Sequence, residues 1–246
     1  MNLIIDIGNT RTKVGVFSGE KLLKKGVLEK EWSIGSLDQW LGKREIKNVA
    51  ISTTAGIDEK IEQELANRYY YLRLSHKTAL PIRNSYKTPE TLGRDRLAVA
   101  VAATDIFPKK NCLIIDAGTC ITYDFIDKNK IYIGGSITPG VEMRLKAMNA
   151  FTANLPLVAR KKLSATIGND TVTSIRTGAQ HGATVEMEGN IRHYKALFGR
   201  LQVLLTGGDA KYFAENLKTQ LFVNQNLVLI GLNKILNYNV QLLGKI

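Results

Sequence analysis

The sequence contains few residues of the kinds that cross-link, anchor or export a protein. Its 246 residues include two cysteines and three histidines, too few for a disulfide framework or a metal-binding pattern of the common kinds. No apolar run approaches the roughly 18 residues that a membrane-spanning helix needs. An early Asp6 interrupts the N-terminus, where a secretory signal would show a basic and then an apolar segment. These features predict a cytoplasmic globular protein without a membrane partner.

Acidic residues are also in deficit, with 22 Asp and Glu against 34 Lys and Arg, for a net charge of +12. Such a balance can attract nucleic acid or small anions. The basic pairs are scattered, however, and there is no arginine-rich tail, zinc finger or aromatic RNA-binding signature. Because a spread charge supports only non-specific contact, nucleic-acid binding is not expected to be the main function.

What the sequence does contain is a distinctive first stretch, residues 3–13, which reads LIIDIGNTRTK. The apolar run Leu3–Ile5 predicts a buried strand that ends at Asp6. Gly8 and Asn9 suit a tight turn, and a second strand is expected to follow through Lys13. An ordinary hairpin with polar turn residues is the alternative.

The chemistry of this hairpin favours a phosphate site. Backbone N–H groups of the turn and the hydroxyls of Thr10 and Thr12 can surround phosphate oxygens, and Lys13 can add a point charge. A carboxylate at the strand end, Asp6, is suited to hold Mg²⁺, which bridges phosphates and keeps several waters.

The same phrase recurs at residues 113–122, LIIDAGTCIT, with identical residues at six of the ten positions. The second carboxylate is Asp116, and Thr119 falls opposite Asn9. Two matching strand–Asp–turn–strand units predict a fold of two similar halves. Two such hairpins facing one cleft would form a nucleotide site.

A third stretch, residues 91–103, combines charge with a helix start. Its alanine-rich run predicts a helix with Thr91 as N-cap, which puts Asp95 and Arg96 in the first turn. A carboxylate there is favoured by the helix dipole, and helix-start electrostatics is therefore the alternative. Three charges beside a glycine after the long loop 81–92 are costly to bury without a ligand. They favour a catalytic or substrate-binding role.

Later segments give weaker signals. Residues 134–140, GGSITPG, are expected to be a glycine-rich loop before a helix over 141–150. A long helix is predicted from about Thr171 to Phe198, with close helix packing as the reason for Gly178 and Gly182. Glu186 and Glu188 on this helix are expected in solvent. Residues 206–209, TGGD, follow a strand as a turn.

In this order and spacing, the stretches resemble type III pantothenate kinases of the acetate and sugar kinase, Hsp70 and actin superfamily, from Met1 to about Leu232. The fold class implied is α/β, with two similar actin-like (ribonuclease H-like) halves, each a mixed sheet flanked by helices, and an ATP cleft between them. The join is expected near residues 107–111 and gives halves of 1–110 and 111–246. The sequence markers of the resemblance are Asp6–Lys13, Gly93–Arg96, Asp116–Thr119, Gly134–Gly140, Thr152–Pro156 and Thr206–Asp209.

The resemblance also implies the function: ATP-dependent phosphorylation of pantothenate to 4'-phosphopantothenate, the first step of coenzyme A biosynthesis, by a homodimer. Asp95 is the implied catalytic base. The cofactors implied are ATP, Mg²⁺ at Asp6 through phosphate or water, and a monovalent cation, K⁺ or NH₄⁺, at Asp116. The implied ATP contacts are Asp6, Ile7, Gly8, Asn9, Thr10, Arg11, Thr12, Lys13 and Thr119. The implied substrate contacts are Tyr86, Gly93, Arg94, Asp95, Arg96 and Thr171.

Two rival functions stay open at this point. One is another small-molecule kinase or phosphohydrolase of the superfamily, since the residues alone lead only to a two-lobed ATP-binding phosphotransferase. The other is a pantothenate-kinase-like transcription accessory factor, which the basic charge allows. Three acidic residues expected at the cleft, Asp6, Asp95 and Asp116, favour catalysis over binding alone.

Overall fold

The structure is a computed structural model that describes residues 1–8, 10–29, 31–54 and 56–244. The described residues group into two compact units. Unit 1 comprises residues 1–108, 129–133 and those from 226 onward, and unit 2 comprises 109–128 and 134–225. None of the described helices is long and apolar enough to cross a membrane.

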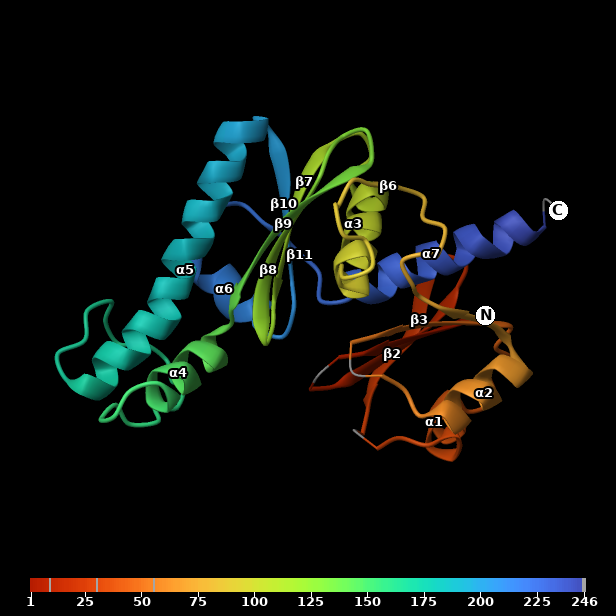
Figure 1. Cartoon of the computed structure of the whole chain (residues 1–246), viewed down its shortest axis with the longest axis horizontal. Coiled ribbons are helices and arrows are strands. Elements are labelled where there is room, and N and C mark those ends of the chain that lie inside the picture. Colours follow the sequence, from red (N-terminus) through yellow and green to blue (C-terminus); the bar gives the residue numbers. More distant parts are fainter. Residues whose placement is uncertain (9, 30, 55, 245–246) are drawn as a thin grey trace. The chain divides into compact units, whose positions relative to one another are not determined.

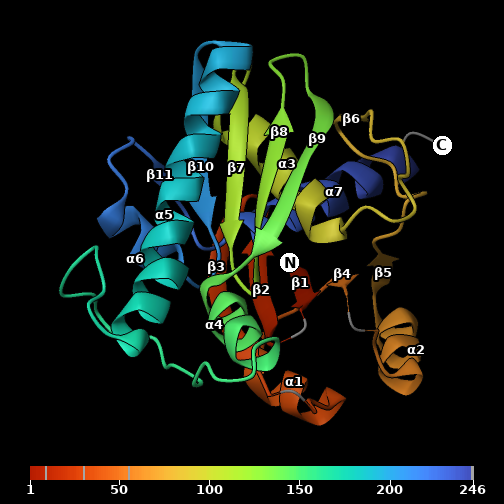
Figure 2. The ribbon, with the colours of Figure 1, turned by 60° about the vertical axis from the view of Figure 1, so that its left-hand side comes forward.

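Unit 1, whose first strands are red in Figure 1, is built on a five-stranded mixed sheet with the order β3-β2-β1-β4-β5, and Figure 2 labels these strands. The first three strands pair antiparallel, whereas β4 and β5 continue the sheet in parallel. Alternate β1 residues, Leu3 and Ile5, pack with α1 and α2 on one face, and α7 contacts β1 and β4. The elements are β1 (Asn2–Ile7), β2 (Thr12–Ser18), β3 (Lys21–Leu28), α1 (Ile34–Leu41), β4 (Asn48–Thr53), α2 (Glu59–Arg68), β5 (Tyr70–Arg73), β6 (Arg83–Asn84), α3 (Arg94–Ile106) and α7 (Leu227–Leu243).

The C-terminal helix α7 belongs to unit 1 because buried polar and close-packed contacts hold it there. The Asn2 side chain donates to Asn233 at 2.8 Å and to Asn237 at 2.7 Å. A Cβ at Gly231 would lie 1.8 Å from the Ala98 carbonyl oxygen, so α7 and α3 touch backbone to backbone. This grouping differs from a simple division at residue 110, because the chain returns to its first half after completing the second.

Unit 2 is organised around a second mixed sheet, ordered β11-β10-β7-β8-β9-β6. The last of these strands, β6, pairs with Ile131 and Tyr132 at the start of β9, which are unit 1 residues. The long helix α5 covers one face of this sheet (Figure 2). Its residues Ala183 and Met187 pack in the hydrophobic core of unit 2. The elements are β7 (Asn111–Ala117), β8 (Cys120–Ile126), β9 (Ile131–Pro139), α4 (Val141–Ala150), α5 (Thr171–Phe198), β10 (Leu201–Thr206), α6 (Ala210–Asn216) and β11 (Phe222–Val223). The prediction of two mixed sheets with flanking helices is confirmed.

The two repeated hairpins occupy equivalent places in their sheets. Asp6 and Asp116 are each the last but one residue of a strand that pairs antiparallel with the next strand and parallel with another. The registers differ beyond the turn, because Asp6 lies opposite Lys13 whereas Asp116 lies opposite Thr122. The first turn is one residue longer, so the sequence match of Thr12 with Thr122 does not hold in space.

Two local predictions were wrong. The helix over 94–106 has Gly93 at its N-cap position rather than Thr91. Most of the glycine-rich segment 134–140 lies within β9 instead of forming a loop. Its Gly135 is required by space, since a Cβ there would lie 1.6 Å from the Tyr123 carbonyl oxygen on β8.

Candidate active site

The first hairpin presents Asp6 at the carboxyl end of β1. In the sheet register, Asp6 lies between Lys13 of β2 and Ser52 of β4. In-register residues of adjacent strands face the same side of a sheet. The three neighbouring strands β2, β1 and β4 therefore place an amine, a carboxylate and a hydroxyl side by side on one face of the sheet. The Ser52 hydroxyl is buried and has no hydrogen-bond partner among the described residues.

The remaining hairpin residues differ in exposure. The turn begins with a hydrogen bond of 3.1 Å from the Gly8 N–H to the Arg11 carbonyl. Thr10 and Arg11 are exposed, whereas Ile7 and Thr12, which pair with each other, are buried. Asn9 lies outside the described residues. The exposed residues are thus at the turn, where a phosphate could be approached by the backbone.

The second hairpin brings Asp116 against a neighbouring turn. Asp116 is in register with Thr206 of β10. One Asp116 carboxylate oxygen lies 2.5 Å from where a Cβ at Gly207 would be, and Gly207 has a φ of +98°. Only glycine fits this position, both in space and in backbone conformation. Thr119 is exposed in the turn, and the Gly118 N–H donates to the Cys120 carbonyl at 2.9 Å.

A third cluster lies at the first turn of α3. Asp95 Oδ1 accepts a hydrogen bond of 2.9 Å from the Arg96 backbone N–H. A Cβ at Gly93 would lie 2.5 Å from this same oxygen, so Gly93 makes room for the carboxylate at the helix start. Arg96 is only 6% exposed, and its guanidinium carbon lies 5.9 Å from the centre of the Tyr86 ring. A carboxylate, a guanidinium and a ring are therefore assembled here.

Arg94 supports the loop that precedes this helix. Its guanidinium donates to the Pro89 carbonyl at 2.8 Å and to the Glu90 carbonyl at 2.9 Å. Burial lowers the pKa of Arg94 from its ordinary value, with a smaller opposing effect from Glu90. These bonds fix the loop against α3, and a direct contact of Arg94 with substrate stays a prediction.

Thr171 is the exposed first residue of α5. The preceding Asp170 caps this helix, because its carboxylate accepts a bond of 2.8 Å from the Thr173 N–H. This bond is the largest cause of the lowered pKa of Asp170.

The predicted site residues divide between the two units. Tyr86, Gly93, Asp95 and Arg96 lie together in unit 1. Asp116, Thr119 and Thr171 belong to unit 2.

Sequence reasoning missed two ion pairs in unit 2. Asp209 of the TGGD turn pairs with Arg160 at 2.5 Å, and the Arg160 guanidinium lies 4.5 Å from the centre of the Tyr212 ring. Glu186 pairs with Arg144 at 2.5 Å. The side chain of Glu188 is only 23% exposed and accepts from the Lys218 N–H at 3.1 Å. The expectation that both glutamates lie in solvent was therefore wrong. The two residues of each ion pair are distant in the sequence, and no motif links them.

The donor atoms suit metal ions held mainly by substrate and water. Among the described residues there is no group of three or more His, Cys, Asp or Glu side chains that could hold a metal. A single carboxylate such as Asp6 fits Mg²⁺, which usually binds through one or two carboxylates plus phosphates. At Asp116, the adjacent Thr206 hydroxyl is a buried oxygen without a hydrogen-bond partner in the described chain, and oxygen ligands suit a hard cation.

Comparison with known proteins agrees with these features. The family model of type III pantothenate kinase matches residues 2–193. A type III pantothenate kinase of Christiangramia forsetii is 43% identical over 97% of this chain and 99% of its own length. One of Bacteroides fragilis is 45% identical over 97% of this chain and 98% of its own.

Solved structures show the same fold at low identity. A protein from Campylobacter jejuni assigned to the Baf family of transcriptional activators has a TM-score of 0.61 at 22% identity, covering 97% of this chain and 99% of its own. An activator of 2-hydroxyisocaproyl-CoA dehydratase from Clostridium difficile, solved with ADPNP, has a TM-score of 0.57 at 13% identity, covering 99% and 97%.

The two sheets, each with a strand-end carboxylate, give the chain an actin-like fold, and the matched family is one of kinases. The match over most of the chain and the identities above 40% assign the particular family. The chain belongs to the type III pantothenate kinases.

Proposed function

We propose that this protein transfers the γ-phosphate of ATP to the primary hydroxyl of pantothenate, giving 4'-phosphopantothenate for coenzyme A biosynthesis. The observation that carries the assignment of roles is the cluster at the start of α3. Asp95 is held there by the Arg96 N–H, beside the buried Arg96 guanidinium and the Tyr86 ring. Family membership supplies the substrate.

In the proposed reaction, Asp95 accepts the proton of the substrate hydroxyl. The hydroxyl oxygen forms a bond to the γ-phosphorus as the bond from that phosphorus to the bridging oxygen of ATP breaks, which leaves ADP. Phosphoryl transfer depends mostly on positioning and charge neutralisation. Arg96 is suited to hold the pantothenate carboxylate, because a planar guanidinium can bind a carboxylate through two hydrogen bonds. Tyr86, Gly93, Arg94 and Thr171 complete the proposed substrate contacts.

The proposed nucleotide contacts are the hairpin residues 6–13 and Thr119. Mg²⁺ would be held at Asp6 and would neutralise phosphate charge. A monovalent cation, K⁺ or NH₄⁺, would be held at Asp116, and the Thr206 hydroxyl supports this because it is a buried oxygen without a hydrogen-bond partner in the described chain, in register with the carboxylate.

A homodimer is also part of the proposal, and the exposed side of α5 supports it. Gly178, Gly182, Val185 and Gly189 recur at helical spacing, and Val185 is 49% exposed. Apart from the glycine, its chain neighbours and the nearby backbone of α5, no heavy atom of the described residues would lie within 4 Å of a Cβ at Gly178 or Gly182. The described residues therefore do not supply the close packing expected at these glycines, and a second copy of the chain would supply it. Large apolar side chains are also exposed elsewhere in unit 2, among them Ile137, Phe151, Leu157 and Ile167.

A coupled assay of ADP release tests the function directly. Activity should require pantothenate and Mg·ATP and should be higher with K⁺ than with Na⁺. ATP consumption that is the same with and without pantothenate would instead indicate a phosphohydrolase of the same fold. We expect the enzyme in the cytoplasm, where ATP is supplied, and fractionation of cells with detection of the native chain tests that expectation.

A further inference from the structure

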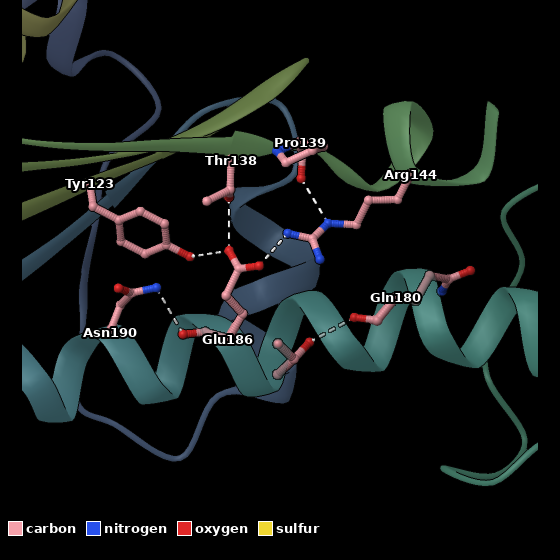
Figure 3. Close-up of polar contacts among 8 residues, drawn as sticks. Tyr123, Thr138, Pro139, Arg144, Gln180, Glu186 and Asn190 are labelled. Carbon is pink, nitrogen blue, oxygen red and sulfur yellow. Dashed lines mark hydrogen bonds and ion pairs between the residues drawn. The ribbon is translucent and has the colours of Figure 1, made fainter. Parts of the chain in front are cut away.

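Glu186 lies near the middle of α5, and its carboxylate is the meeting point of four elements. It accepts hydrogen bonds from Tyr123 of β8 at 3.2 Å, from Thr138 of β9 at 2.8 Å and from Arg144 of α4 at 2.5 Å. Figure 3 shows the three donors converging on the carboxylate from the side of the sheet and α4. Its side chain is only 30% exposed.

These bonds hold the carboxylate in one geometry. Tyr123 is fully buried, and its pKa is raised mainly by burial and further by the charge of Glu186. Tyr123 therefore remains a hydrogen-bond donor at neutral pH. The bond from Arg144 joins two charged groups, and such bonds are about twice as strong as those between neutral groups. Loss of the Glu186 charge would weaken all three contacts together.

The same network fixes the backbone where β9 passes into α4. Arg144 donates through Nε to the Pro139 carbonyl at 2.8 Å while its Nη2 binds Glu186. Thr138 is bound directly by Glu186. The segment 138–144, which we call the β9–α4 junction, is thus tied to α5 at both of its ends.

The β9–α4 junction in turn rests on the turn of the second hairpin. The Gly140 N–H donates to the Thr119 carbonyl at 3.0 Å. A Cβ at Gly140 would lie 2.2 Å from the Gly118 oxygen and 2.6 Å from the Thr119 oxygen. The two backbones are therefore in direct contact, and a shift of the junction must also shift the turn that carries Thr119.

We infer that Glu186 is a positioning residue for nucleotide binding. It holds the β9–α4 junction against the Gly118–Thr119 turn and so sets the place of Thr119. The inference rests on the proposed function, in which Thr119 contacts ATP. Glu186 acts through Thr138, Pro139 and Arg144. Its removal therefore lowers the affinity for ATP and leaves the KM of pantothenate unchanged.

The test compares Glu186→Gln with a matched control on the same helix. Glu188→Gln makes the same chemical change two residues away, where the carboxylate accepts from the Lys218 N–H at 3.1 Å. The readouts are the Kd of Mg·ATP by isothermal titration, the KM of each substrate and the thermal midpoint. We expect Glu186→Gln to raise the Kd of ATP about tenfold, which corresponds to about 1.4 kcal/mol, because the weakened network no longer fixes the turn that carries Thr119. The KM of pantothenate should be unchanged, and Glu188→Gln should leave both constants unchanged.

An ATP affinity equal to that of the control would overturn the inference. So would a parallel change of both substrate constants with a fall of the thermal midpoint, because that pattern indicates a merely structural role. If Glu186→Gln does not fold, Thr138→Val removes one donor and keeps the side-chain shape, and an unchanged Kd of ATP in that variant also counts against the inference. A wild-type protein that fails to phosphorylate pantothenate contradicts the proposed function itself, whereas an active wild type with unaltered ATP affinity in Glu186→Gln contradicts only the role of Glu186.

Discussion

Asp116 on β7 is in register with Thr206 on β10, and the Thr206 hydroxyl is buried without a hydrogen-bond partner in the described chain. Unit 1 repeats the arrangement, since Asp6 is in register with Ser52, whose hydroxyl is also buried and unbonded among the described residues. An unsatisfied buried hydroxyl lowers stability. Two such groups, each beside a carboxylate at a strand end, are expected where ligands complete the site.

The variant Thr206→Val tests this interpretation, because it keeps the shape and removes the oxygen. Loss of an unbonded buried hydroxyl should leave the free energy of unfolding unchanged or raise it by about 1 kcal/mol. Activation by K⁺ should weaken, since the Asp116 site loses an oxygen ligand. Urea unfolding and a K⁺ titration of the rate check the two effects. A stable variant with an unaltered K⁺ titration would mean that Thr206 plays no part in cation binding.

Asp95→Asn is predicted to lower kcat by about 10²–10⁴-fold, the usual contribution of a general base, because it removes the proton acceptor and keeps the shape. Binding of Mg·ATP should survive. The helix-start alternative predicts nearly normal turnover and a stability loss of roughly 0.3–1 kcal/mol. Asp105→Asn, near the other end of α3 and paired with Lys234, is the control. Measuring kcat and the thermal midpoint on the same samples separates the two interpretations.

The sequence could predict features that depend on near neighbours. The apolar runs ending at Asp6 and Asp116 and the alanine-rich run after Asp95 are local patterns, and each predicts the type of its element correctly. The N-cap of the helix was predicted at Thr91 but lies at Gly93. The contact of Asn2 with Asn233 could not be predicted, because it joins residues 231 positions apart. Glu186 was missed for a similar reason, since helical periodicity does not identify donors on other elements.

The repeat also misled in one detail, at the second strand of each hairpin. Identity at Thr12 and Thr122 suggested equivalent positions, yet the longer first turn puts Lys13 opposite Asp6 and Thr122 opposite Asp116. A shift of one residue moves side chains to the other face of a strand. Turn length, which sequence similarity alone does not weigh, therefore decides which residue lies beside each carboxylate.

The proposed dimer predicts that bulk on the exposed side of α5 dissociates it. Gly182→Leu should not disturb its own chain, because a Cβ there meets open space in the described structure, and leucine favours helix over glycine by up to about 1 kcal/mol. Ala66→Leu on the exposed side of α2 adds bulk elsewhere and is the control. Analytical ultracentrifugation should show monomers only for Gly182→Leu. A Gly182→Leu protein that stays dimeric would remove this face of α5 from the interface.

Asn233→Ala is predicted to lower the free energy of unfolding by about 1–3 kcal/mol, because it leaves buried polar partners unbonded. Asn233 is 1% exposed. It accepts from Asn2 and donates to the Gly19 carbonyl at 2.9 Å. Asn239 lies on the same helix and donates to the Ala79 and Ile235 carbonyls. The variant Asn239→Ala should lower the free energy of unfolding by less. Urea unfolding of both variants gives the comparison, and equal losses would argue against a special role for the buried asparagines in holding α7.

The last prediction concerns Cys112, a fully buried residue of β7. Burial raises the pKa of its thiol from 9.0 to about 12, an effect that the charge of Lys110 only partly offsets. In the unfolded chain the thiol ionises near its ordinary pKa, so between pH 9 and 12 the unfolded state binds fewer protons than the folded state. The free energy of unfolding must therefore fall as pH rises through this range. Between pH 8 and pH 10, the free energy of unfolding of the wild type should fall by about 1 kcal/mol more than that of Cys112→Ala. Urea unfolding at both pH values measures this change. A constant difference in the free energy of unfolding between the two proteins would mean that the Cys112 thiol titrates alike in the folded and unfolded states. In a separate test of burial, iodoacetamide should alkylate the half-buried Cys120 before Cys112.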